Sequence, residues 1–181
     1  MTLRKNLLVL PLTMLLLTSC GASSISYEDA VKFVNDNYTA TEAKTPKKGI
    51  TKCQGYASND ASKAAMADNL KMIGITLNEN NHYENEETEG LLPIPVLKSE
   101  QLPKAKDETT TSTYQVKGKQ LIVVQHTKMQ FDHSVTETTS ESYFNDQGYQ
   151  YKQNFVFGYK DDVDDKNIID FSYTLVLISE F

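Results

Sequence analysis

Arginine and tryptophan are almost missing from this chain of 181 residues. Arg4 is the sole arginine and there is no tryptophan, so the basic side chains that follow are lysines. Lysine lacks the planar guanidinium fork that holds a phosphate with two parallel hydrogen bonds. The formal net charge is −6. Charge and donor geometry together argue against nucleic acid as a partner.

Cysteine is scarce as well, since the chain has only Cys20 and Cys53. If Cys20 is modified, as argued below, no partner is left for an intramolecular disulfide. A chain of this length can build a core without one, because it can bury about 70% of its unfolded surface. Cys53 is expected to be a small, partly buried side chain. The alternative is a reactive or intermolecular thiol, although no CxxC pair or nearby histidine supports it.

The chain has a single long apolar run. Residues 7–17 follow Arg4 and Lys5 and lead into residues 17–20, which read Leu-Thr-Ser-Cys. The run is too short to span a bilayer permanently. The pattern resembles a bacterial lipoprotein signal peptide that ends in a lipobox. The resemblance implies that the chain is cleaved before Cys20 and that diacylglycerol is attached to the Cys20 thiol. An ordinary secretory signal with a coincidental cysteine is the alternative.

The same resemblance gives the expected organisation and location. It implies a cleaved signal peptide over residues 1–19 and a lipidated tether over residues 20–26. The length of the remaining chain predicts a single globular domain over residues 27–181. The acyl chains would hold the domain firmly on the extracytoplasmic face of the cell membrane, or on an outer membrane if the source is diderm. Cleavage would make the chain two charges more negative than −6, because it removes Arg4 and Lys5.

Two amphipathic helices are expected in the first half of the domain. Ser26 begins the first with a pattern like a capping box, and apolar side chains recur at helical spacing over residues 27–38. The second helix is predicted over residues 60–73, with Asn59 in position to cap it. Residues 45–56 contain one proline and two glycines, so they are expected to form a loop.

From residue 114 onward the apolar period changes from about 3.6 to about 2, which predicts strands. The polar segments 78–90 and 97–113, before this change, are expected to be loops. The expected strands are residues 114–116, 121–131, 135–144, 149–159 and 168–178. The sequence therefore predicts an α+β fold, with two N-terminal helices packed on a long antiparallel β-meander.

The last two expected strands carry large side chains at odd-numbered positions. These are Tyr149, Tyr151, Phe155, Phe157 and Tyr159, followed by Ile169, Phe171, Tyr173, Leu175 and Leu177. A period of two assigns them to one face of the sheet. Two outcomes remain open. If both helices lie flat on this face, it is core. If the sheet curls into a half-barrel or cone, it encloses an apolar hollow suited to a lipid.

Candidate metal ligands are few. His126 and His133 are seven positions apart, so on one regular strand they point to opposite faces, and His82 lies far away in the sequence. A zinc site is therefore not expected. The densest acidic cluster is Asp161, Asp162, Asp164 and Asp165. It is a weak calcium candidate, because it lacks the glycine and the bidentate glutamate of an EF-hand, and we expect a hydrated turn.

Catalytic motifs are missing too, since the chain has no HExxH, GxSxG, Walker or GxGxxG pattern. His126 could pair with Asp132 or Glu137 for acid–base chemistry, but the spacing does not require it. No catalytic residue and no cofactor is assigned. The sequence predicts a lipid-anchored extracytoplasmic protein with a binding or interaction domain whose ligand it does not identify. The partners it leaves open are a protein, an envelope polymer or an apolar ligand. One alternative is a carrier of an apolar or lipid ligand, and the other is an envelope hydrolase.

Overall fold

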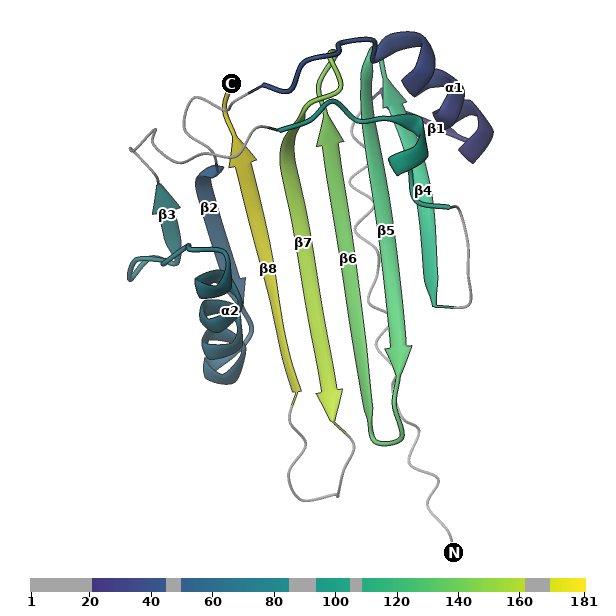
Figure 1. The fold of residues 1–181 in the computed structure, drawn as a ribbon. Coiled ribbons are helices and arrows are strands. Elements are labelled where there is room, and N and C mark those ends of the chain that lie inside the picture. The colour runs from purple at the N-terminus through teal and green to yellow at the C-terminus, as the bar shows by residue number, and fades with distance from the viewer. Residues whose placement is uncertain (1–20, 45–49, 85–93, 105–108, 162–169) are drawn as a thin grey trace, which may run out of the picture.

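The computed structural model describes residues 21–44, 50–84, 94–104, 109–161 and 170–181. Over these ranges the chain forms one open antiparallel sheet of eight strands, two α-helices and a short 3-10 helix (Figure 1). The elements are β1 (Ser23–Ile25), α1 (Tyr27–Asn37), β2 (Ile50–Ala57), α2 (Asp60–Met72), β3 (His82–Glu84), η1 (Ser99–Gln101), β4 (Thr110–Lys117), β5 (Gln120–Gln130), β6 (Ser134–Phe144), β7 (Gln150–Asp161) and β8 (Asp170–Ser179). Their order across the sheet is β1-β4-β5-β6-β7-β8-β2-β3.

The predicted β-meander is confirmed. Strands β4 to β8 follow one another in the sheet as they do in the chain, and the last four lie within two residues of their expected bounds. Local turn chemistry explains this. Gly118 adopts a φ of +61° between β4 and β5. Between β6 and β7, the Asn145 side chain accepts hydrogen bonds from the backbone N–H groups of Gln147 and Tyr149, both at 3.0 Å.

Both helices begin where the sequence predicts. The Ser26 hydroxyl accepts the backbone N–H of Asp29 at 3.0 Å, and the Asn59 side chain accepts that of Ser62 at 2.8 Å. The helices do not, however, form a pair in front of the sheet. Strand β1 precedes α1, and β2 lies between the two helices.

The loop expected over residues 45–56 is wrong from Ile50 onward. Residues Ile50–Ala57 form β2, which pairs with β8 on one side and β3 on the other. In the sequence, Gly55 indicated a loop. In the structure it lies within β2, where the lack of a side chain lets α2 pack closely against the strand. A Cβ atom at Gly55 would lie 2.6 Å from the Met66 sulfur of α2, so only glycine lets the helix lie this close to the strand.

Short polar strands account for the other differences. The expected tether contains β1, which pairs with residues 114–116, and the expected loop 78–90 contains β3. Strand β4 begins at Thr110, four residues earlier than predicted. These segments are polar and paired through their backbones, so they lack the alternating apolar pattern that identifies a strand in a sequence.

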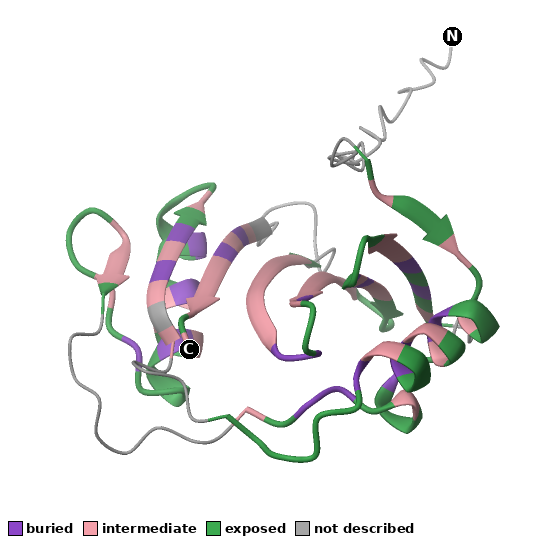
Figure 2. Cartoon of the chain, turned by 90° about the horizontal axis from the view of Figure 1, so that it is seen from above, coloured by how far each residue is buried: buried purple, intermediate pink, exposed green. Residues whose placement is uncertain are grey.

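Two separate cores lie on the same face of the sheet. Helix α1 packs at the β4 and β5 end, and α2 packs on β8 and β2. Val123 in β5 and Leu177 in β8 lie in one row of directly paired residues across the sheet, so their side chains are on the same face. Val123 belongs to the core under α1 and Leu177 packs against the core under α2, so both helices cover this face. The middle strands between the helices have intermediate burial (Figure 2). We call this side the helical face.

The shared face predicted for the last two strands is confirmed in part. Phe155 lies opposite Leu175, and Phe157 lies opposite Tyr173. Tyr151 is an error in the prediction, because the register shifts beside it and its ring packs 6.3 Å from that of Tyr143 on the other side of the sheet. The face is also not uniformly buried. Tyr173 and Leu175 are buried, whereas the phenylalanines are only half-buried.

Candidate functional site

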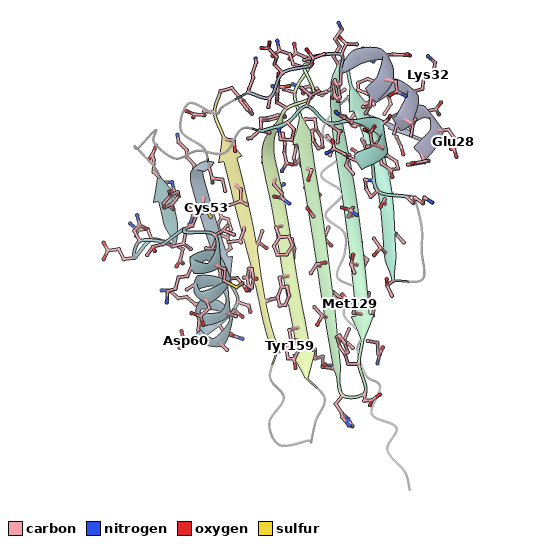
Figure 3. All side chains as sticks on the ribbon, in the orientation of Figure 1. Glu28, Lys32, Cys53, Asp60, Met129 and Tyr159 are labelled. Atoms are coloured by element: carbon pink, nitrogen blue, oxygen red, sulfur yellow. The ribbon has the colours of Figure 1, made fainter. Side chains whose placement is uncertain are left out.

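The candidate site is a groove beside α2, where the helix stops short of covering the helical face. Met66 and Leu70 of α2 are fully buried against β2 and β8. Cys53, beneath the helix, is also fully buried (Figure 3). The neighbouring strand β7 lies outside the helix footprint. The large side chains on the helical face therefore continue from β8, beneath α2, to β7, which α2 does not cover.

The groove has a volume of about 350 Å³, near the lower end of the range of about 300–1,000 Å³ typical of ligand pockets. Its lining comes from α2, β6, β7 and β8 and consists of Asn69, Leu70, Ile73, Thr138, Gln153, Phe155, Phe157, Tyr173, Leu175 and Leu177. Six of these ten side chains are hydrocarbon, four of them aliphatic and two phenylalanine. Ile73 at the rim is 56% exposed.

The rings in the groove are held in a fixed arrangement. Phe157 and Tyr173 stack across β7 and β8, with ring centroids 5.3 Å apart and an interplanar angle of 18°. The Asn69 side-chain amide donates to the Tyr173 hydroxyl oxygen at 2.5 Å. Burial raises the pKa of Tyr173 above its usual value of 10, so the phenol is neutral at physiological pH.

The remaining polar groups of the lining are also neutral. The Gln153 amide donates to the Ser140 hydroxyl at 2.9 Å, which fixes the end of the groove on the β6 side. None of the ten lining residues carries a formal charge. A charged ligand group would therefore lose its hydration without gaining an ionic partner. The arrangement is suited to holding an uncharged apolar group, and it offers no side chain that exchanges a proton near neutral pH.

A second hollow of similar volume, about 370 Å³, lies at the loop after α1. It is lined mainly by residues 37–44 and by the β6–β7 turn. Its cation is already engaged, because the Lys44 ammonium hydrogen-bonds to the Gln147 side chain at 2.6 Å and lies 4.9 Å from the centre of the Tyr149 ring. This hollow has no comparable apolar floor.

His82 and His126 lie on different strands of the sheet. His126 lies in β5 and makes a 3.0 Å hydrogen bond to the Thr139 hydroxyl, while His82 lies in β3. The acid–base pair of His126 with Glu137 is not formed, because Glu137 binds the Lys128 ammonium at 2.7 Å. Within the described ranges, no three His, Cys, Asp or Glu side chains are grouped closely enough to hold a metal ion.

The other predicted site residues lie largely outside the described ranges. These are Cys20, Asp162, Asp164 and Asp165, and of Asp161 only the backbone at the end of β7 is described. Their predictions therefore stand as predictions. For Cys53, burial raises the pKa of the thiol to about 11, so the thiolate needed for reaction is scarce at neutral pH.

Sequence reasoning pointed to the aromatic face but did not find the groove. Its lining depends on where α2 ends over the sheet and on the insertion of β2 next to β8.

Neither helix in the part of the chain described here is long and apolar enough to cross a membrane. No protein-family model, no curated protein and no solved structure matches the chain.

Proposed function

We propose that the protein is a lipid-anchored binding protein on the extracytoplasmic face of a membrane, and that its groove takes the apolar part of a small, uncharged amphiphile. The observation that carries the binding role is the aromatic floor of the groove, which α2 leaves half uncovered. The observation that supports the anchor is the leader, which ends in Leu-Thr-Ser-Cys at Cys20.

The energetics favour an occupant for this groove. Burial of apolar surface stabilises by about 25 cal/mol per Å². Phe155 and Phe157 keep part of their surface in water, although their neighbours Tyr173 and Leu175 are almost fully buried, with 3% and 6% exposure. An acyl chain or ring laid along β7 would bury this remaining surface. The uncharged lining favours a ligand whose buried part carries no charge.

The partly open shape has the same implication. The two helices flank the helical face without meeting across it, so the middle of the sheet forms the floor between them (Figures 1 and 2). This is an intermediate between the two outcomes that the sequence left open, a filled core and a curled sheet with a hollow. We interpret it as an open half-barrel with an apolar groove beside α2.

The anchor gives the first testable prediction. Protein extracted from the membranes of the organism should start at Cys20 and carry the added mass of acyl chains, because the thiol is the acceptor in proteins with this kind of leader. Intact-mass spectrometry is the measurement. Cys20→Ser should abolish both the cleavage and the added mass. Cys53→Ser, the matched control at the other cysteine, should preserve both. An unmodified Cys20 in the membrane fraction would refute the anchor.

The groove gives the second prediction. A chain of residues 21–181 should bind the neutral dye N-phenyl-1-naphthylamine with an increase in its fluorescence. Thr138→Phe should weaken binding by about tenfold or more, because a ring at this position fills the groove and a loss of about 1.4 kcal/mol of contact is enough for that change. Dodecanol should displace the dye better than dodecanoate at neutral pH, since the lining offers no cation.

The matched control for this variant is the next residue along β6. Thr139 points to the opposite side of the sheet, where its hydroxyl bonds to His126. Thr139→Phe therefore adds the same ring to the same strand outside the groove and should leave dye binding unchanged. Urea unfolding of both variants shows that they are folded. Equal loss of binding in the two variants, or no binding by the parent chain, would contradict the proposal.

A further inference from the structure

Strand β1 ties the start of the domain to one end of the sheet. Ser23 pairs with Val116, one residue before the end of β4, and Val116 in turn pairs with Leu121 near the start of β5. Ser23 is the third residue after Cys20, and three residue steps reach at most about 10 Å. A group attached to Cys20 therefore stays close to the turn that connects β4 and β5.

This turn carries two lysines, Lys117 and Lys119, on either side of Gly118, and all three residues are exposed. The Tyr38 hydroxyl donates to the Lys119 carbonyl at 3.1 Å, which attaches the turn to the end of α1. Neither lysine has an ion-pair partner among the residues that the structure describes. Four other lysines do have one, namely Lys32, Lys52, Lys71 and Lys128.

We propose that the β4–β5 turn is the surface that faces the membrane, with both lysine ammonium groups bound to the phosphates of anionic phospholipids. This inference rests on the proposed acylation of Cys20, which brings the turn to the headgroup layer. The charge of the chain favours the same orientation. Cleavage before Cys20 removes Arg4 and Lys5 and leaves 16 lysines against 24 acidic residues, a net charge of −8. The domain as a whole is then repelled by an anionic surface, so the two exposed lysines beside the anchor lower the cost of approach at this turn.

The orientation places the rest of the sheet away from the bilayer. Strand β5 runs from Gln120 beside the turn to Gln130, and its eleven residues span about 33 Å at the usual rise of 3.3 Å per residue. Met129 marks the far end of this strand (Figure 3). The sheet would stand upright on the membrane, and the groove on the helical face would remain open to the surrounding solution.

The test uses strand β5 as a ruler. The acylated protein is labelled with a donor dye at Gln120→Cys or at Asp132→Cys. Both positions are exposed, one at the start of β5 and the other two residues beyond its end. The buried Cys53 thiol, with its raised pKa, competes little for the dye. In phosphatidylglycerol-containing vesicles with an acceptor on the lipid, energy transfer should be severalfold stronger from position 120 than from position 132.

Paired charge variants test the role of the lysines. Lys117→Ser with Lys119→Ser should shift the population away from the upright orientation by about fivefold for each lysine, the equivalent of about 1 kcal/mol each near an anionic surface. In vesicles of phosphatidylcholine alone, energy transfer from positions 120 and 132 should become equal. Lys63→Ser with Lys71→Ser removes two lysines from α2 instead, and it should leave the difference between the two positions unchanged.

Vesicle flotation separates the two proposals. Protein that floats with the vesicles but shows equal transfer from both positions, or is unaffected by loss of Lys117 and Lys119, overturns the orientation and leaves the lipid anchor intact. Protein that lacks acyl mass and does not float overturns the anchor and this inference together. Floating protein with unequal transfer that depends on both lysines and on anionic lipid supports both.

Discussion

Tyr114→Ala should lower the free energy of unfolding by about 3–5 kcal/mol, the range for truncation of a buried aromatic side chain. Tyr114 is 1% exposed in the core beneath α1. Its ring packs 6.0 Å from that of Tyr27, and its hydroxyl donates to the Pro103 carbonyl. The substitution removes the ring and leaves a carbonyl without its donor, so the cavity and the lost hydrogen bond act together. Urea unfolding measures the change.

Two further tyrosine variants divide this effect into its parts. Tyr114→Phe keeps the ring and removes the hydroxyl, so it should cost only about 1 kcal/mol. Tyr56→Ala removes a ring that is 59% exposed on β2 and should change stability by less than about 0.5 kcal/mol. If Tyr114→Ala costs no more than Tyr56→Ala, then α1 does not pack on the sheet as described.

The β-meander could be predicted from the sequence because its determinants are local. Large side chains alternate with smaller or polar ones over much of β7 and β8, and the turns at Gly118 and Asn145 separate β4 from β5 and β6 from β7, so nearby residues indicate both the strands and their order. Strand β2 could not be found in this way. Its partner β8 is more than a hundred residues away in the chain, and Gly55 has a packing role that only α2 reveals.

The sequence predicted part of the candidate site but not its extent. The odd-numbered positions correctly placed Phe155, Phe157 and Tyr173 on one face, because a regular strand requires it. The same rule failed at Tyr151, where a register shift beside Phe144 reverses the side on which the ring lies. How much of the face is covered depends on the footprint of α2 on the sheet, and helical periodicity within α2 carries no information about that.

The β6–β7 turn provides the second large expected effect. Gly148→Ala should cost about 2–5 kcal/mol, because two penalties coincide there. Gly148 has a φ of +86°, a left-handed conformation that costs a residue with a Cβ about 1–2 kcal/mol. The new Cβ would also lie 2.7 Å from Cγ of Tyr38, and overpacking of this kind costs about 1–3 kcal/mol.

Tyr38 has little freedom to move out of the way. Its hydroxyl donates a hydrogen bond to the Lys119 carbonyl, and its ring packs edge-on against that of Phe33, with ring centroids 5.6 Å apart.

Gly118→Ala is the matched control. Gly118 has a φ of +61°, but among the described residues no atom lies within 4 Å of the place that its new methyl group would take. It should therefore show the conformational penalty of about 1–2 kcal/mol alone. Urea unfolding of the two variants gives the comparison. Equal losses at the two glycines would mean that Tyr38 yields to the methyl group, and that the junction between α1 and the β6–β7 turn is softer than its contacts indicate.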